Sequence, residues 1–303
     1  MEKGTKPRKT VIFLTIAAIL AVVSIVSAIM LYGELRQSKK EADTFAELAA
    51  MRLPAKEGET AAPTGVPKVP ASTPVQAIRT PDPNASEPDD AAPAQEEPEE
   101  EPTAEPEPEP TPLARYLPLY ERNHDYFGWL TIPETNVDYP VMHSPDRPLQ
   151  YLEHDFDGKF AYAGVPFMDG ECDPDGNVYL IYGHRMRNGS IFGGLVAYMD
   201  KRFWEKQPII HFDTLYEERT YMVIVAMHAR VLESGEQNGF RYYNYTSLDT
   251  EEDFDEYMRQ AHKLAMYDTG LTASYGDELL VLSTCDNFTQ DGRFVIIAKR
   301  IMD

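Results

Sequence analysis

The most constraining feature of this chain is an uncharged apolar run near its start. Residues 11–32, VIFLTIAAILAVVSIVSAIMLY, contain no charged side chain. A helix of that length, at about 1.5 Å per residue, spans the roughly 30 Å hydrocarbon core of a bilayer. Basic residues outnumber acidic ones in residues 1–10, so the positive-inside rule keeps this tail in the cytoplasm. The sequence therefore predicts a single-pass cell-membrane protein with an extracellular C-terminal part.

A cleaved signal peptide is the alternative interpretation of the same run. The apolar core of a signal peptide is normally about 7–15 residues long and precedes a small-residue cleavage site. This run is longer, and no Ala-x-Ala pattern follows it. We interpret residues 11–32 as an uncleaved transmembrane signal anchor.

The composition changes sharply after a predicted juxtamembrane helix at 33–53. Residues 54–112 hold fifteen of the 24 prolines, and residues 87–109 hold eleven acidic residues and no basic ones. Such a segment cannot bury enough apolar area to fold, so we expect 33–112 to form a helix followed by a disordered stalk. Half of the formal net charge of −22 lies in that acidic stretch, and this charge argues against nucleic acid as a partner.

Residues 113–303 form the predicted folded domain, which is large enough for one core. A short helix is expected within 113–123. The rest of the domain is rich in β-branched and aromatic residues, with Gly, Pro, Asn and Asp between short runs, which favours a β-sandwich or a closed barrel. The predicted strands are VDYPVM, GVPFMD, NVYLIYGH, QPIIHF, TYMVIVAMHARVL, ELLVLST and RFVIIAKRI.

One helix interrupts the predicted strands. Residues 249–266 place Phe254, Met258, Ala261 and Ala265 on one helical face, and Thr250 and Asp253 have capping-box spacing. We expect this helix to cover a barrel edge or to contribute to substrate binding.

The segment LVLSTCDNFTQDGRFVII contains the candidate chemistry. Cys285 ends one predicted strand and Arg293 opens the next, and the intervening residues suit a hairpin loop. Antiparallel pairing would bring the two side chains together. An arginine beside a thiol favours the reactive thiolate and can also donate hydrogen bonds to an oxyanion.

A thiol nucleophile needs an acid–base partner, and His184 is the best candidate among seven histidines because it follows a predicted strand end. Neither the cysteine nor the histidine is strong evidence for catalysis by itself, since a cysteine in an apolar strand is commonly a core residue. The other cysteine, Cys172, lies in a turn-rich acidic loop and is expected to have no role. Neither cysteine has metal-ligand spacing.

Three segments in this order resemble the sortases, and most closely those of class B. LSTC followed by GRFVIIAKRI resembles the segment that holds the catalytic Cys and Arg. YLIYGHRMRNGSIFGGL resembles the histidine segment, and YFGWLTIPETNVDYPVM resembles the first strands. The resemblance covers residues 115–301. It implies a mainly β fold, a closed barrel of about eight strands with an N-terminal helix and an inserted helix before the cysteine strand.

The resemblance also implies residue roles. Cys285 would be the nucleophile, His184 the general acid and base, and Arg293 the oxyanion donor. Substrate-binding positions would be Leu152, Tyr182 and Ser283. It implies no cofactor and no metal.

The implied activity is cysteine transpeptidation. The enzyme would cleave a C-terminal sorting motif of secreted proteins after Thr and transfer the acyl group to a peptidoglycan cross-bridge amine. A pilus-assembling enzyme with a pilin lysine as acceptor is one alternative. A tethered, non-catalytic surface-binding module, in which Cys285 only packs, is another.

Overall fold

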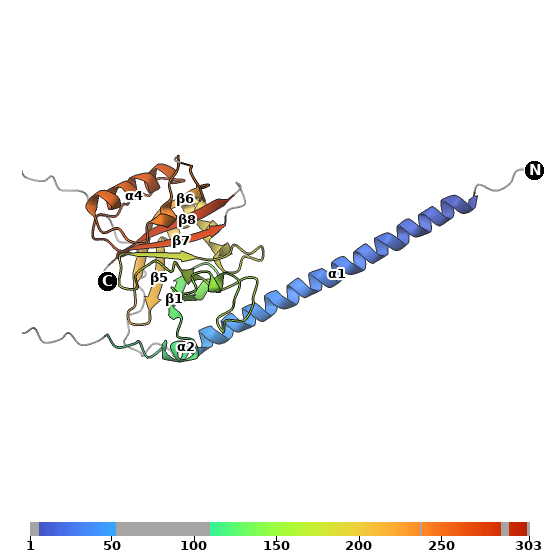
Figure 1. Cartoon of the computed structure of the whole chain (residues 1–303), viewed down its shortest axis with the longest axis horizontal. Helices are drawn as coiled ribbons and strands as arrows, with labels where there is room; N and C mark the ends of the chain where they lie inside the picture. Colours follow the sequence, from blue (N-terminus) through green and yellow to red (C-terminus); the bar gives the residue numbers. More distant parts are fainter. Residues whose placement is uncertain (1–5, 53–109, 237, 286–290, 302–303) are drawn as a thin grey trace, which may run out of the picture. The chain divides into compact units, whose positions relative to one another are not determined.

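The computed structural model describes residues 6–52, 110–236, 238–285 and 291–301 (Figure 1). The predicted anchor and the predicted juxtamembrane helix form one helix, α1 (Lys6–Met51). Within the described residues, α1 from Ile12 onward is the one helix long and apolar enough to cross a membrane. The predicted disorder of 54–112 falls mostly on residues 53–109, which lie outside the described residues.

Eight strands close into a barrel with the order β1-β2-β3-β4-β7-β8-β6-β5. The β2–β3 and β4–β7 pairs are parallel, and the other pairs are antiparallel. The predicted closed barrel of about eight strands is therefore confirmed. The strands are β1 (Tyr126–Ile132), β2 (Val137–Met142), β3 (Phe167–Met168), β4 (Val178–Tyr182), β5 (Ile209–Thr214), β6 (Thr220–Arg230), β7 (Leu279–Cys285) and β8 (Gly292–Ile301).

The strands β4, β6, β7 and β8 are apolar along most of their length because both of their faces are covered there. In β7, every residue from Leu279 to Thr284 is buried, and only the last residue is exposed. The main apolar cluster fills the barrel, with Phe212, Val225, Leu280 and Ile296 among its fully buried members.

Helices pack on the outside of the barrel. They are α2 (Leu117–Arg122), α3 (Lys201–Lys206), α4 (Glu251–Leu264) and the 3-10 helices η1 (Gln150–Leu152), η2 (Phe192–Met199) and η3 (Tyr242–Asn244). The helix that the sequence predicts before the cysteine strand is α4. The Thr250 side chain accepts a hydrogen bond from the backbone N–H of Asp253, as the capping-box spacing predicted.

The α4 helix covers the barrel with Phe254, Tyr257, Met258 and Ala261. Its end is attached to β6, because the Met266 N–H donates to the Ala226 carbonyl. This contact favours the covering role over a role in substrate binding. The sequence did not predict η2 or α3, because their aromatic and glycine-rich residues give no regular apolar spacing.

A second apolar cluster lies where α2 and the end of α1 meet the barrel. It contains Leu48 from α1, Leu119 from α2, Trp129 from β1 and Phe167 from β3, all buried. The domain therefore includes the last turns of α1 as well as residues from Pro110 onward.

Candidate active site

Cys285 and Arg293 are direct neighbours across the β7–β8 pair. The register places Cys285 opposite Arg293, with Thr284 opposite Phe294. The Cys285 thiol is free and exposed. The predicted side-by-side arrangement is confirmed, and a role for Cys285 in core packing is wrong because its side chain reaches solvent.

The end of β4 meets the end of β7 because these two strands are parallel. Tyr182 is level with Ser283, and the Gly183 N–H donates to the Ser283 carbonyl at 3.2 Å. The Thr284 hydroxyl donates to the Gly183 carbonyl at 2.8 Å. These two bonds hold the start of the histidine segment against the cysteine strand, so His184 and Cys285 lie at the same end of the barrel.

His184 has one ring nitrogen available for proton transfer. Its Nε2 is buried and has no hydrogen-bond partner among the residues that the structure describes. The Tyr162 ring stacks on the imidazole, with centroids 6.2 Å apart and planes 8° apart. The His184 carbonyl accepts a hydrogen bond from the Phe192 N–H at 2.9 Å, which fixes the backbone on that side.

Arg293 is half-buried at the start of β8, where its Nη1 donates to the Gly292 carbonyl at 2.9 Å. Tyr242 from η3 lies in the same region. Burial raises the pKa of Tyr242 to about 12, although the Ser283 hydrogen bond and the positive charge of Arg293 act in the opposite direction. The Tyr242 phenol is therefore neutral at physiological pH.

The three predicted substrate-binding residues lie near this end of the barrel but differ in exposure. Ser283 is 1% exposed, and its hydroxyl is 2.8 Å from the Tyr242 hydroxyl. Tyr182 is half-buried and donates to an Asp169 carboxylate oxygen at 3.0 Å. Leu152, at the end of η1, is partly buried against the second cluster. Because Ser283 is almost fully buried, little of its side chain is open to direct contact with a substrate.

Cys172 is not the loose loop thiol that its sequence context indicated. It lies between regular elements, as expected, but its side chain is 2% exposed and belongs to the main apolar cluster. Burial raises the pKa of the Cys172 thiol to about 12. The acidic turn residues around it concealed this burial in the sequence.

Three side chains at the site were missed by the sequence analysis. Tyr162, Tyr242 and Thr284 contact His184, Ser283 and Gly183, respectively. Thr284 could have been found, because it directly precedes the candidate cysteine. The two tyrosines gave no signal, since they belong to loops whose return to the barrel depends on tertiary contacts.

The site can perform covalent catalysis with side chains alone. A solvent-exposed thiol, an imidazole nitrogen without a partner and a guanidinium meet the requirements for nucleophile, acid–base group and oxyanion donor. In the part of the chain that the structure describes, no three His, Cys, Asp or Glu side chains are arranged to hold a metal ion.

Comparisons with known proteins agree with this geometry. The sortase domain family matches residues 130–301. Sortase B of Listeria monocytogenes is 32% identical over 191 residues, which are 60% of this chain and 72% of that protein. A solved Staphylococcus aureus sortase B–substrate complex has a TM-score of 0.55 at 25% identity, covering 62% of this chain and 84% of that chain. A Bacillus anthracis sortase B structure has a TM-score of 0.53 at 26% identity, covering 62% and 85%.

The contrast between the two thiols predicts selective alkylation. Iodoacetamide at neutral pH should modify Cys285 in the folded chain and leave Cys172 unmodified, because Cys172 is buried and keeps its proton. Mass spectrometry of peptides would locate the label, and both thiols should react in denaturant. Comparable labelling of Cys172 in the native protein would contradict the burial described above.

Proposed function

Because this chain belongs to the sortase family and is a class B cysteine transpeptidase, we propose that it cleaves a C-terminal sorting motif of secreted proteins after Thr. It then transfers the acyl group to a cell-wall amine. The observation on which this proposal rests is the convergence of the ends of β4 and β7 with the start of β8, which gather His184, Cys285 and Arg293.

The first half-reaction makes a thioacyl enzyme. The Cys285 thiolate attacks the scissile carbonyl carbon, and the resulting oxyanion accepts hydrogen bonds from the Arg293 guanidinium. His184 donates its proton to the departing amine as the C–N bond breaks. Among the described residues, none forms a hydrogen bond with the Nε2 atom of His184 and so competes with substrate for it, which supports this role.

The second half-reaction transfers the acyl group to the acceptor. A neutral primary amine attacks the thioester carbonyl, His184 takes the amine proton, and the C–S bond breaks to regenerate the Cys285 thiolate. Leu152 and Tyr182 would line the groove for the sorting peptide. Ser283 would shape that groove through its hydrogen bond with Tyr242.

The anchor supports a location at the cell membrane. Residues 11–32 would cross the bilayer once, with 1–10 in the cytoplasm and the barrel outside. Side chains of α1 from Ile12 to Leu35 are exposed, and most are apolar, as a lipid-facing surface requires.

The test is transpeptidation by the purified full-length protein with a sorting-peptide library and two acceptors, a cross-bridge peptide and a lysine-bearing protein. Mass spectrometry should detect a thioacyl adduct on Cys285 and a new amide with an acceptor. Cys285→Ala should remove both, whereas Cys172→Ser should behave as wild type. Turnover by Cys285→Ala above about a thousandth of wild type would rule out Cys285 as the nucleophile. Exclusive use of the lysine-bearing protein would indicate a pilus-assembling enzyme.

Arg293 provides a test of geometry as well as charge. Arg293→Ala should lower kcat/KM by about 10²–10³, the typical loss of one oxyanion donor. Arg293→Lys keeps the positive charge but loses the planar set of donors, and it should be nearly as poor. The pH dependence of Cys285 alkylation separates an effect on the thiol from one on the oxyanion. If the kcat/KM of Arg293→Lys stays within about fivefold of wild type, Arg293 acts through its positive charge alone.

Thr284 tests the link between the histidine and cysteine strands. Thr284→Val keeps the side-chain shape at this 2% exposed position but leaves the Gly183 carbonyl without its hydroxyl donor. We expect kcat to fall roughly tenfold, equivalent to about 1.4 kcal/mol, because His184 is then less firmly positioned. Thr284→Ser, which keeps the hydroxyl, should retain most activity. Equal activity of the Val and Ser variants would show that this bond does not position the histidine.

A further inference from the structure

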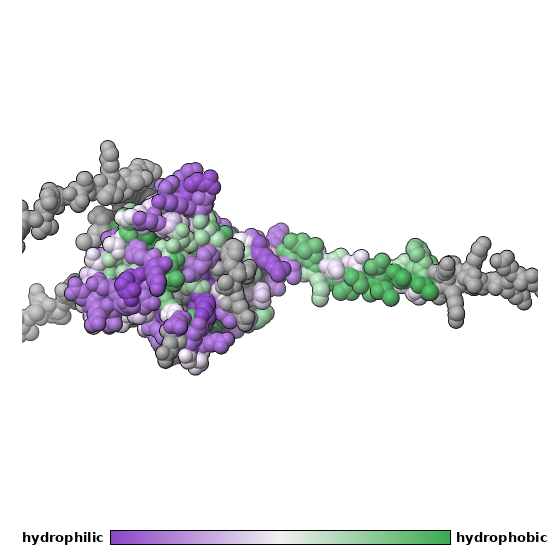
Figure 2. Space-filling view, turned by 90° about the horizontal axis from the view of Figure 1, so that it is seen from above, coloured by the Kyte–Doolittle hydropathy of each residue, from purple (hydrophilic) through white to green (hydrophobic). Residues whose placement is uncertain are grey.

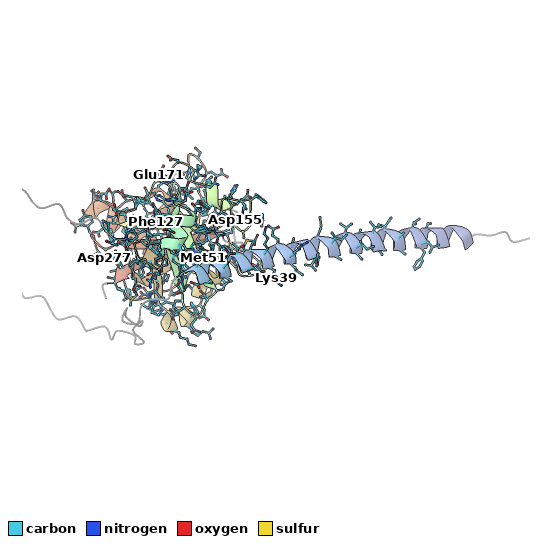
Figure 3. All side chains as sticks on the ribbon, turned by 90° about the horizontal axis from the view of Figure 1, so that it is seen from below. Lys39, Met51, Phe127, Asp155, Glu171 and Asp277 are labelled. Atoms are coloured by element: carbon cyan, nitrogen blue, oxygen red, sulfur yellow. The ribbon has the colours of Figure 1, made fainter. Side chains whose placement is uncertain are left out.

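The helix that contains the membrane anchor continues into the catalytic domain. Along α1, hydrophobic residues give way to hydrophilic ones before the helix reaches the barrel (Figure 2). Met51, at its C-terminal end, lies against the barrel side chains (Figure 3). No break in the helix separates these two parts, because α1 runs from Lys6 to Met51.

One face of α1 makes the contact. Its members recur every three or four residues, which is the spacing of a single helical stripe. We call this set the docking face: Ser38, Glu41, Phe45, Leu48 and Arg52. Leu48 is fully buried in the second apolar cluster, and the Phe45 ring meets Tyr139 of β2 edge-on at 4.8 Å. In contrast, Asp43 and Ala50 are exposed.

Polar contacts fix the C-terminal end of the docking face. The Arg52 guanidinium lies 4.4 Å from the centroid of the Trp129 ring and 3.7 Å from an Asp138 carboxylate oxygen. Glu47 forms an ion pair at 2.8 Å with Arg122 of α2. The last turn of α1 is therefore held by two strands and a helix of the catalytic domain.

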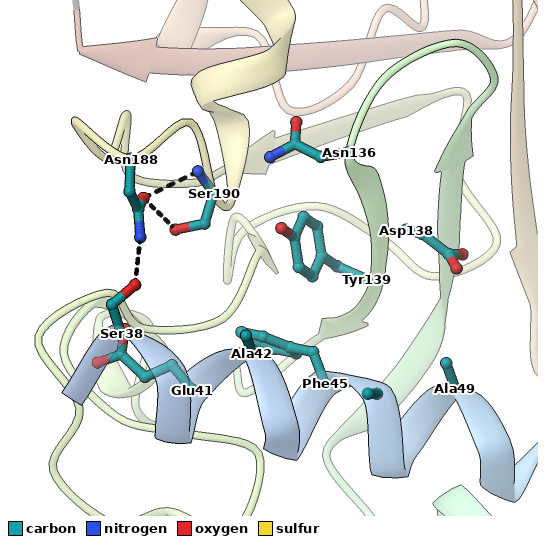
Figure 4. A pocket seen from close by; sticks show the side chains of 11 residues that line it. Ser38, Glu41, Ala42, Phe45, Ala49, Asn136, Asp138, Tyr139, Asn188 and Ser190 are labelled. Carbon is teal, nitrogen blue, oxygen red and sulfur yellow. Dashed lines mark hydrogen bonds between the residues drawn. The ribbon is translucent and has the colours of Figure 1, made fainter. Parts of the chain in front are cut away.

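The other end of the docking face meets the histidine segment. The Asn188 side-chain amide donates to the Ser38 hydroxyl at 2.7 Å, and its oxygen accepts from the Ser190 N–H at 3.0 Å (Figure 4). Tyr139, which Phe45 contacts, accepts a hydrogen bond from the Ile191 N–H. A cavity of about 250 Å³ lies between α1 and the barrel here, and Ser38, Phe45 and Tyr139 are among the residues that line it.

We propose that the docking face clamps the barrel to the anchor helix at a fixed height, directly above the outer membrane surface. This inference rests on the proposed membrane crossing of residues 11–32. Ser38 lies six positions after Tyr32 along the helix, a rise of about 9 Å, which is close to the thickness of one headgroup layer. The tip of the histidine segment would then lie at the level of the headgroups.

The Pro- and Glu-rich segment takes on a different role in this arrangement. It follows Arg52 and precedes Thr111, and these two residues belong to the same compact unit. The chain is again attached to the barrel at Leu113, whose N–H donates to the Leu215 carbonyl at 2.8 Å. Because α1 itself contacts the barrel, we expect the length of this segment not to set the distance between barrel and membrane.

The distance between barrel and membrane can be measured by energy transfer in the full-length protein in phospholipid nanodiscs. A donor dye on Glu252→Cys, an exposed position of α4, reports to acceptor dyes on lipid headgroups, in a Cys285→Ala background. Leu48→Asp should lower the transfer efficiency because it places a charge where α1 is buried against the barrel. Ala50→Asp, which adds the same charge on the exposed side of α1, should leave the transfer efficiency unchanged. Deletion of half of residues 54–109 should also leave it unchanged.

The opposite pattern would overturn the proposal: a change on halving the segment, with Leu48→Asp indistinguishable from wild type. A disulfide cross-link tests the same contact without the Leu48→Asp substitution, so this second test does not depend on how that variant folds. Oxidation should join Ser38→Cys to Asn188→Cys. It should not join Lys40→Cys to Asn188→Cys, because Lys40 is exposed and two positions along a helix turn the side chain by about 200° from that of Ser38. Absence of the first cross-link would also refute the clamp. None of these measurements uses catalysis, so they can fail or succeed independently of the proposed reaction.

Discussion

Strand β7 pairs with a parallel neighbour on one side and an antiparallel neighbour on the other, and the candidate site depends on this combination. Parallel pairing brings the end of β4 to the end of β7, and antiparallel pairing brings the start of β8 to the same place. A parallel pair needs a long crossover, which here contains η2, α3, β5, β6 and α4. Most of the domain thus lies between the histidine and the cysteine.

Buried polar contacts support the exposed thiol. Directly below Cys285, Thr284 and Ser283 are almost fully buried, and each hydroxyl has one partner, Gly183 and Tyr242 respectively. Such bonds are worth more in an apolar surrounding than in water, and breaking one leaves a buried polar group unpaired. Cys285 is therefore held at the end of a rigid strand, where its side chain is open to solvent while Ser283 and Thr284 are buried.

The candidate membrane helix α1 and the barrel that holds the candidate site belong to one structural unit. The helix ends in the apolar cluster that also contains Leu119 and Trp129, and its side chains reach the segment that follows His184. A long proline-rich segment after a membrane helix is ordinarily a spacer. In this chain the candidate membrane helix also packs directly on the barrel, through Phe45 and Leu48.

The sequence alone predicted the membrane helix, the α4 cap, most of the strands and the proximity of Cys285 and Arg293. All of these depend on local patterns: an uncharged run, a capping-box spacing, short apolar runs and a hairpin. The resemblance to known sortases added β1 and favoured a closed barrel over a sandwich. His184 was already the best histidine candidate from its place after a strand, and its catalytic role stays a prediction.

Only the tertiary structure decided which side chains surround those residues. The burial of Cys172, the bond between Ser283 and Tyr242, and the docking of Leu48 each join segments far apart in the chain. Apolar spacing indicates that a helix face will be covered, but it does not specify what covers it. That choice depends on how the closed barrel brings distant loops and helices together, because packing acts between surfaces and not along the sequence.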